Sequence, residues 1–319
     1  MKKIAFILCL FILVSCSQDP KKQEKENQKT RKPFEVTIDW VPSPEYYGFF
    51  VAKQEGLYKE IGLDVTIKYG SGAPVVANLI ASNSIYAGTT TSDNILRQVA
   101  MGGEFYKIFP ILNFNPTVLV SLKSNPIGNM TGINNKMIGV NKQSSAYQQF
   151  QYIVNNNPKI QKNSIKEFPI GWGGAAQLES NQVDAFLAYA TNAAIDLKVK
   201  NIEFTEIFFS DQGVHLYGLV LAFASKEAFQ ANNITEEDVQ KFAKATIAGY
   251  KLGGENVELA INSLMKAEPT LDKKKIELAV KRIHELNSEK PTDFEKLDEW
   301  VSAAEITKGV REKTLLLYK

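Results

Sequence analysis

Hydrophobic and polar positions follow two different periods along the chain from residue 33 onward. In FEVTID at 34–39 every second residue is apolar, whereas the apolar residues of 46–61 recur mostly at helical spacing. The first period is typical of a strand and the second of an amphipathic helix. A second strand pattern follows at 63–69, and this alternation predicts βαβ units in a mostly parallel sheet. The last third of the chain has only the helical period, and Gly253-Gly254 is expected to end a helix there.

The order of strand and helix starts again between two long apolar runs. These runs are TVLVSLKS at 117–124 and LYGLVLAFAS at 216–225. We interpret both as crossover strands at a hinge, so that residues 33–122 and 220–319 form lobe 1 and residues 123–219 form lobe 2. The predicted fold class is a bilobal α/β fold with two mostly parallel sheets flanked by helices and two crossover hinge strands. In such folds a ligand lies at the carboxyl ends of the strands and in the cleft between the lobes.

The first 32 residues differ in composition from the rest of the chain. Two lysines precede an apolar run at 4–14 and then Ser15-Cys16-Ser17, which is typical of a signal peptide and too short to span a bilayer comfortably. LVSC at its end resembles a bacterial lipobox, in which Cys16 becomes the lipidated first residue once residues 1–15 are removed. An ordinary signal peptide that contains a cysteine is the alternative. Residues 16–32 are polar and charged and are expected to form a flexible tether, which would place the protein on the outer side of the cell membrane.

Net charge and cysteine content exclude several classes of function. Lys and Arg total 37 and Asp and Glu total 35, so the formal net charge of +2 does not favour binding to nucleic acid. Cys9 lies in the segment to be removed and Cys16 would be acylated, which leaves no thiol for a disulfide, a metal site or a nucleophile. The two histidines, His215 and His284, form no ligand cluster in the sequence, and no catalytic motif is present. We therefore predict no catalytic residue, no metal and no cofactor.

Aromatic and polar residues gather near the predicted carboxyl ends of strands, where side chains face the cleft. The aromatic candidates are Trp40, Tyr46, Tyr47, Trp172 and Tyr189, and the polar candidates are Thr90, Asn113, Thr191 and Asn192. Stacked rings hold flat aromatic ligands, and each pair adds about 0.5–1.5 kcal/mol beyond burial. Amides donate and accept hydrogen bonds, as uncharged heterocycles require. The alternative is structural, because rings also fill the space between sheet and helix and polar residues also cap helices.

The kind of ligand is narrowed by what these turns lack. The GSGAP turn at 70–74 could present backbone N–H groups to an anion at a helix start. No Arg lies in any of the candidate turns, however, and a sulfonate or phosphate favours a bidentate guanidinium. The turns therefore favour an uncharged heteroaromatic ligand.

Four segments resemble the solute-binding proteins of ABC importers for sulfonates, nitrate, thiamine pyrimidine precursors and riboflavin. They are residues 39–65, LIASNSIYAGTTTSDNIL at 79–96, KMIGV at 136–140 and NQVDAFLAY at 181–189. The resemblance implies a periplasmic-binding-protein-like monomer that closes on its ligand and delivers it to a permease and its ATPase. The Tyr pair and DQGVHLYGLVL look like the members that bind pyrimidine or flavin, and Thr191-Asn192 resembles the riboflavin members. We therefore predict that the cleft binds a flat heteroaromatic vitamin or vitamin precursor, riboflavin somewhat ahead of a thiamine pyrimidine precursor. A sulfonate-type ligand and a role as a surface sensor are the alternatives.

One branch of the same superfamily is enzymatic, namely the fungal pyrimidine synthase that holds pyridoxal phosphate on a lysine and consumes its own histidine. Alignment of IASNSIYAGTTTSDN with that branch places Thr90 at the lysine position and Asn94 at the histidine position. Without the amine and the histidine this chemistry has no starting point. We therefore predict that the chain is not an enzyme.

Overall fold

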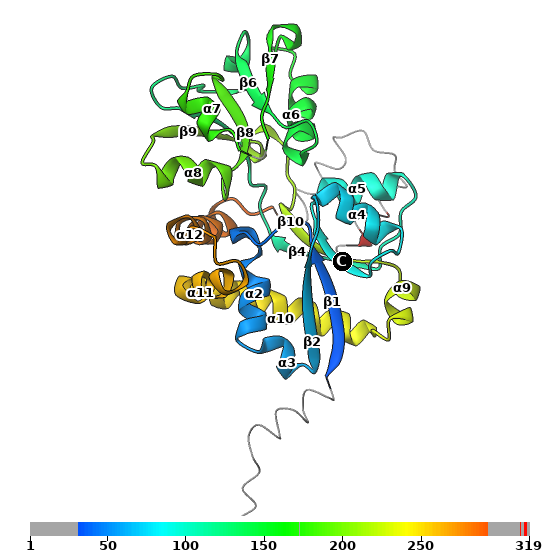
Figure 1. The fold of residues 1–319 in the computed structure, drawn as a ribbon. Helices are drawn as coiled ribbons and strands as arrows, with labels where there is room; N and C mark the ends of the chain where they lie inside the picture. Colours follow the sequence, from blue (N-terminus) through cyan, green and yellow to red (C-terminus); the bar gives the residue numbers. More distant parts are fainter. Residues whose placement is uncertain (1–30, 172, 293–312, 314–315, 318–319) are drawn as a thin grey trace, which may run out of the picture.

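The computed structural model describes residues 31–171, 173–292, 313 and 316–317, which form two lobes (Figure 1). The signal segment, Cys16 and most of the expected tether lie outside the described residues. Lobe 1, the lower one in Figure 1, contains a sheet with the strand order β2-β1-β3-β10-β4. Lobe 2 contains a sheet with the order β7-β6-β8-β5-β9.

The strands alternate with helices as the hydrophobic pattern predicted. The strands are β1 (Lys32–Ile38), β2 (Leu63–Tyr69), β3 (Ala87–Thr90), β4 (Lys107–Leu112), β5 (Thr117–Leu122), β6 (Met137–Val140), β7 (Lys166–Pro169), β8 (Ala185–Tyr189), β9 (Phe204–Phe208) and β10 (Leu219–Phe223). The helices of lobe 1 are η1 (Pro44–Tyr46), α2 (Tyr47–Gln54), α3 (Leu57–Glu60), α4 (Ala73–Ala81), α5 (Ser92–Ala100), α9 (Lys226–Ala231), α10 (Glu236–Glu255), α11 (Val257–Ala267) and α12 (Lys273–Glu289). The helices of lobe 2 are η2 (Met130–Ile133), α6 (Ser145–Asn156), η3 (Lys162–Ser164), α7 (Ala175–Glu179), α8 (Ala193–Val199) and η4 (Ser210–Gln212).

Each sheet has one strand that runs against the others. β10 is antiparallel to β3 and β4, and β5 is antiparallel to β8 and β9, while the remaining described pairs in both sheets are parallel. The two reversed strands are the first strands after the chain passes from one lobe to the other. Because four of the five strands in each sheet share one direction, the prediction of two mostly parallel sheets is confirmed.

The chain crosses between the lobes earlier than the sequence pattern suggested. β5 pairs with β8 and β9 in lobe 2, so the first crossing is at 113–116 and not after residue 122. The second crossing, at 209–218, likewise precedes β10. The two long apolar runs are therefore central strands of the sheets that they enter, and the crossings are the irregular segments before them. A fully buried strand has no polar face, so its sequence does not show to which sheet it belongs.

The ends of two helices, at 46–61 and at 253–254, differ from the prediction. The expected helix at 46–61 is interrupted at Gly56, whose φ of 81° lies in the left-handed region, and this separates α2 from α3. In contrast, α10 continues through Gly253-Gly254 to Glu255, so the expected helix end there is wrong. The reason is close packing of α10 on α2, since a Cβ at Gly253 would lie 2.8 Å from the Tyr47 ring.

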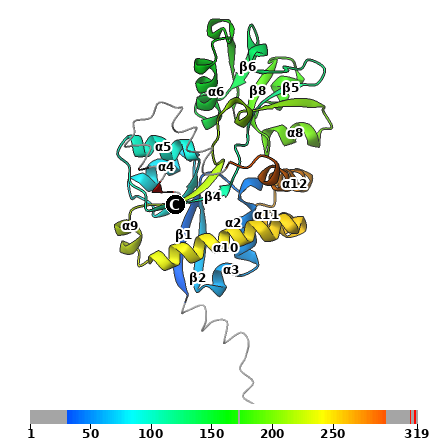
Figure 2. The ribbon, with the colours of Figure 1, turned by 180° about the vertical axis from the view of Figure 1, so that it is seen from behind.

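The long helix α10 crosses lobe 1 behind its sheet and packs on β1 (Figure 2). Phe242 of α10 stacks on Phe34 of β1, with ring centroids 4.3 Å apart, and on Tyr58 of α3 at 5.1 Å. This packing orders β1, and the carboxyl end of β1 carries Asp39 and Trp40 toward lobe 2. No helix in the described part of the chain is long and apolar enough to cross a bilayer.

Candidate functional site

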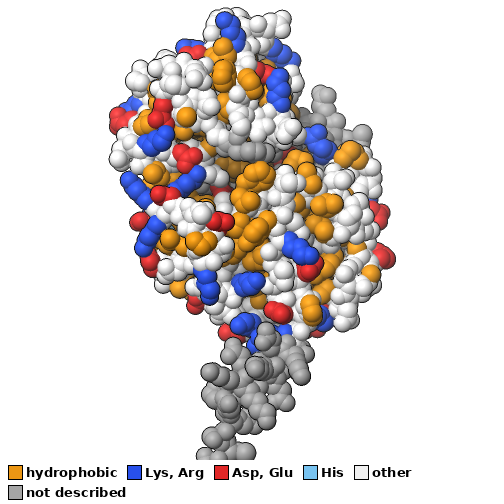
Figure 3. All heavy atoms as spheres, in the orientation of Figure 1, with side chains coloured by type: hydrophobic (Ala, Val, Ile, Leu, Met, Phe, Trp, Pro, Cys, Tyr) orange, Lys and Arg blue, Asp and Glu red, His pale blue; other side chains and the backbone are white. Residues whose placement is uncertain are grey.

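A cavity of about 180 Å³ lies between the lobes, at the carboxyl ends of β1, β2, β6 and β8. It lies in the hollow between the two lobes that is seen from the front in Figure 3. Lobe 1 lines it with Asp39, Trp40, Ser43, Glu45, Tyr46 and residues 72–74. Lobe 2 lines it with Asn141, residues 143–146, Gly171, Gly173, residues 187–189, Asn192 and Ala193. This is the position in which two-lobed α/β folds hold ligands.

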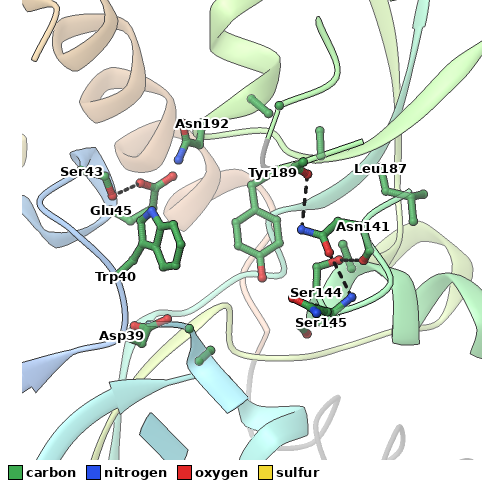
Figure 4. A pocket seen from close by; sticks show the side chains of 18 of the residues that line it. Asp39, Trp40, Ser43, Glu45, Asn141, Ser144, Ser145, Leu187, Tyr189 and Asn192 are labelled. Carbon is green, nitrogen blue, oxygen red and sulfur yellow. Dashed lines mark hydrogen bonds between the residues drawn. The ribbon is translucent and has the colours of Figure 1, made fainter. Parts of the chain in front are cut away.

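Trp40 and Tyr189 form an aromatic surface to which each lobe contributes one ring. Trp40 follows β1, and Tyr189 is the last residue of β8. Figure 4 shows the two rings side by side in the cavity. The Tyr189 hydroxyl is hydrogen-bonded to Ser145 of α6, and burial raises the pKa of Tyr189 well above its ordinary value, so the ring stays neutral. A flat ligand placed on these rings would contact both lobes at once.

Asp39 is a buried carboxyl at the wall of the cavity and is 8% exposed. The Asp39 N–H donates to Thr89 Oγ1 at 2.8 Å, and the Thr89 hydroxyl donates back to the Asp39 carboxyl group. Tyr46 also hydrogen-bonds to Asp39. Burial raises the pKa of Asp39, and these hydrogen bonds offset only part of that increase. The carboxyl is therefore fixed in position while its environment favours a partner that donates hydrogen bonds.

Glu45 is the second buried carboxyl of the cavity, and it connects the two lobes. It is 7% exposed and sits in η1 of lobe 1. Ser43 Oγ donates to Glu45 Oε2 at 2.7 Å, and Thr191 Oγ1 of lobe 2 donates to Glu45 Oε1 at 2.9 Å. Burial raises the pKa of Glu45, while hydrogen bonds and Lys275 lower it in part. The contact between the lobes thus supplies a hydrogen-bond donor to a carboxyl oxygen that is buried in this arrangement.

The charge of the cavity is acidic or neutral, because no Lys or Arg is among the described residues that line it. Lys275 of α12 interacts electrostatically with Glu45 but does not line the cavity. An anionic ligand would therefore meet Asp39 and Glu45 without a cation to pair with. The arrangement suits a flat ligand that is neutral or positive and carries N–H groups.

The sequence matches the model of the family described as NMT1/THI5 like over residues 43–256. The chain belongs to this family. No curated protein matches the sequence significantly. The NMT1/THI5-like match covers the cavity-lining residues of both lobes except Asp39 and Trp40.

Solved structures of periplasmic binding proteins have the same fold as this NMT1/THI5-like chain. The alkanesulfonate-binding protein SsuA from Xanthomonas axonopodis pv. citri, bound to MOPS, is 15% identical with a TM-score of 0.61, over 90% of this chain and 94% of that one. The aliphatic sulphonate binding protein SsuA from Escherichia coli is 14% identical with a TM-score of 0.64, over the same shares. The CA3427 gene product of Candida albicans is 18% identical with a TM-score of 0.61, over 89% of this chain and 95% of that one. These likenesses confirm the predicted fold class.

The structure brings together only part of the residue set that the sequence suggested for this family member. Trp40, Tyr46, Tyr189 and Asn192 line the cavity, and their contact with a ligand stays a prediction. Trp172 lies outside the described residues, although Gly171 and Gly173 on either side of it line the cavity.

The other four candidates lie away from the cavity wall and have structural partners. The Tyr47 hydroxyl donates to Tyr250 O at 2.8 Å, and its ring packs against α10, which is the gap-filling alternative. The Thr90 hydroxyl donates to Ala73 O at 2.8 Å and so supports the turn at 72–74. Thr191 does not line the cavity itself, but its hydroxyl donates a hydrogen bond to Glu45, which does. Asn113 is the first residue of the first crossing, where its backbone carbonyl accepts a hydrogen bond from the N–H of Thr292, while its side-chain Oδ1 is buried without a hydrogen-bond partner among the described residues.

Most of the other lining residues were missing from the sequence-based set, and the three with the clearest bearing on the chemistry of the cavity are Asp39, Ser43 and Glu45. A signal for Asp39 was available, because it directly follows β1 and precedes Trp40. Glu45 gave no such signal, since a glutamate at the start of a helix is ordinarily a solvent-exposed residue that favours the helix dipole. Its burial becomes visible only when lobe 2 is placed against lobe 1.

Proposed function

We propose that this NMT1/THI5-like protein is the substrate-binding component of an ABC importer and that it binds a flat heteroaromatic vitamin or vitamin precursor. The observation that carries the proposal is the aromatic surface of Trp40 and Tyr189 bordered by the buried carboxyls of Asp39 and Glu45. Rings of this kind stack on a heterocycle, and carboxyls accept hydrogen bonds from its amino or ring N–H groups. Closure of the two lobes would then enclose the ligand for delivery to a permease and its ATPase.

A sulfonate-type ligand is the second candidate, because two SsuA proteins named for sulfonate or alkanesulfonate binding share the fold. The charge of the cavity argues against this candidate. A sulfonate retains its negative charge at neutral pH and is ordinarily held by Arg side chains or helix N-termini. The described lining residues include two carboxyls and neither Lys nor Arg, which leaves only the helix starts at 72–74 and 144–146 to hold an anion. We therefore place the sulfonate second.

The size of the cavity bears on the choice between riboflavin and a thiamine pyrimidine precursor. Pockets for drug-sized ligands usually begin at about 300 Å³. A cavity of about 180 Å³ therefore favours a ligand with a single ring over a flavin, which has three fused rings. The sequence resemblance favoured riboflavin, and the volume supports the pyrimidine precursor as the first ligand to test.

The remaining parts of the proposal concern chemistry and location. Thr90 and Asn94 stand where the enzymatic branch has its lysine and histidine, and Asn94 Nδ2 donates to Thr91 Oγ1 at 2.7 Å. We propose that the chain makes and breaks no covalent bond. We also propose that Cys16 is lipidated and holds a monomer on the outer side of the membrane. A surface sensor with the same ligand site would instead be encoded apart from any importer genes.

Purified protein should be titrated calorimetrically with an aminopyrimidine precursor of thiamine, riboflavin and taurine, after its absorbance spectrum has been recorded. The proposal predicts micromolar or tighter binding of the aminopyrimidine or of riboflavin and no measurable binding of taurine. A copurified yellow chromophore would select the flavin. Binding of taurine alone, or failure of both heterocycles to bind below millimolar concentration, would overturn the heteroaromatic assignment.

A further inference from the structure

Helix α12 belongs to lobe 1 but also contacts lobe 2. It packs on α10, α11 and η1 of lobe 1, and it lies against α8 of lobe 2 (Figure 1). Because η1 contains Glu45, the same helix touches an element of the cavity and the opposite lobe. No other described helix of lobe 1 makes as extensive a contact with α8.

Three cations on or next to α12 pair with acids of lobe 2. They are Lys275 with Asp196 at 2.6 Å, Arg282 with Glu206 at 3.0 Å, and Lys290 with Asp211 at 2.8 Å. The cations are spaced seven and eight residues apart, which places them on one face of the helix. All three positive charges lie on lobe 1, whereas Asp196 and Glu206 lie on lobe 2 and Asp211 lies where the second crossing leaves lobe 2. We call these three pairs the α12 clamp.

The clamp extends outward from the crossing between the lobes. Asp211 is in η4, at the start of the second crossing, whereas Asp196 is in α8. The fifteen residues from Lys275 to Lys290 correspond to about 22 Å of helix, so the Lys275 pair acts with the longest lever arm. A rotation about the crossings changes the separation of the Lys275 pair most and that of the Lys290 pair least.

The middle pair of the clamp is largely buried and not fully satisfied. The side chains of Arg282 and Glu206 are 17% and 13% exposed, and the Arg282 guanidinium also lies over the Phe208 ring at 5.7 Å. Among the described residues, Glu206 Oε1 and Arg282 Nε are buried without a hydrogen-bond partner. Substituting one partner would leave the other charge buried without it, whereas opening of the lobes returns both charges to water, so a substitution here is a less clean test than one at an exposed pair.

We propose that Lys275, Arg282 and Lys290 are positioning residues that set the balance between open and closed lobes by pairing with acids of lobe 2. Closing brings opposite charges together, and opening returns them to water. The link to ligand capture rests on the proposed function, but the effect on the lobes themselves does not require a ligand. The outer pair, Lys275 with Asp196, is the one to test because both side chains are partly exposed, so that substituting one of them leaves no fully buried charge.

Single-molecule energy transfer between one dye in each lobe tests this proposal without a ligand. The full chain carries Cys9→Ser and Cys16→Ser, which remove the two natural thiols, and dyes are attached to Lys59→Cys and Lys162→Cys at exposed sites. Lys275→Glu should lower the ratio of closed to open molecules by about fivefold, the effect expected for loss and reversal of one partly exposed pair. Adding Asp196→Lys to the same protein should restore the original ratio.

Lys273→Glu is the matched control on the same helix. Lys273 pairs with Glu258 of α11 at 3.2 Å, so that pair lies entirely within lobe 1. The control should leave the ratio unchanged, while thermal melts confirm that all variants are folded. The proposal is overturned if Lys275→Glu leaves the ratio unchanged, if Asp196→Lys fails to restore it, or if Lys273→Glu lowers it equally. Failure of every heterocycle to bind would refute the proposed ligand and leave these ratios as they are.

Discussion

Replacing Thr191 by valine isolates the hydrogen bond that joins the lobes inside the cavity. Thr191 is fully buried, and its hydroxyl donates to Glu45 Oε1 at 2.9 Å. Valine keeps the shape of the side chain and removes the donor. The Glu45 oxygen then lies in the closed cavity without that partner, whereas in the open form water can reach it. The substitution therefore acts on closure and ligand capture more than on the stability of either lobe.

The size of the effect depends on the charge of Glu45. A hydrogen bond to a charged group contributes about 1.5–3 kcal/mol and one to a neutral group about 0.5–1.5 kcal/mol. For an ionised Glu45, Thr191→Val should weaken affinity for the aminopyrimidine by about 10- to 150-fold. Burial raises the pKa of Glu45, so at a pH below that raised value the carboxyl is neutral and the loss should be smaller. The loss should therefore grow as pH rises.

Isothermal titration calorimetry at several pH values measures this effect, and Thr246→Val is the matched control. Thr246 is also fully buried, but its hydroxyl donates to Phe242 O at 2.9 Å and pairs with Tyr58, entirely within lobe 1. The control should lower the melting temperature and leave affinity unchanged. If Thr191→Val binds within twofold of the natural protein at every pH, the hydrogen bond to Glu45 does not hold the lobes closed and the reasoning fails.

Three further predictions concern the cavity rings, helix packing and pH. Trp40→Ala and Tyr189→Ala should each weaken binding of the heterocycle by about tenfold or more, because each removes a stacking ring, and calorimetry that shows unchanged affinity would contradict the site. Gly249→Ala should destabilise the protein by about 1–3 kcal/mol in urea, since its Cβ would lie 2.2 Å from a backbone oxygen of α2, while Gly254→Ala, whose nearest contacts are side-chain atoms at 3.1 Å, should cost less. Burial raises the pKa of Asp39 above 3.8, so the folded state binds the proton of this carboxyl more tightly than the unfolded state does. The free energy of unfolding should therefore fall as pH rises through the raised pKa. The melting temperature of Asp39→Asn should fall less over the same pH range, and an identical pH profile of the two proteins would refute this prediction.

The alternation of periods was sufficient to predict the layers and most of the strands. The two strands without a clear signal, β4 and β9, lie at sheet edges. β4 contains Pro110, which is tolerated at an edge because one side of the strand needs no hydrogen-bond donor, and such a proline ordinarily argues against a strand. The boundary between the lobes could not be placed from sequence, because β5 is buried on both faces and has no exposed polar face that would assign it to one sheet.

The site was predictable where a side chain directly follows a strand and faces the cleft. Trp40 and Tyr189 are of this kind, and both line the cavity. Tyr46 and Tyr47 are adjacent residues of the same type, so the sequence did not distinguish them. Tyr46 lines the cavity, whereas the ring of Tyr47 is turned toward α10. Glu45 and Thr191 depend on a contact between residues 146 positions apart, and no local pattern contains that information.

The direction of β1 decides how this body could be presented at a surface. β1 starts at Lys32, at the end of lobe 1 far from lobe 2, and runs about 23 Å toward the cavity (Figure 1). In a protein held at a membrane through its N-terminal segment, lobe 1 would therefore lie next to the membrane and lobe 2 farther from it. The cleft would then open sideways and not toward the membrane, so a membrane partner could reach it only after the protein tilts. For the proposed lipidation at Cys16, the fifteen residues between Cys16 and Lys32 would limit the distance between the lipid and the start of β1 to about 50 Å.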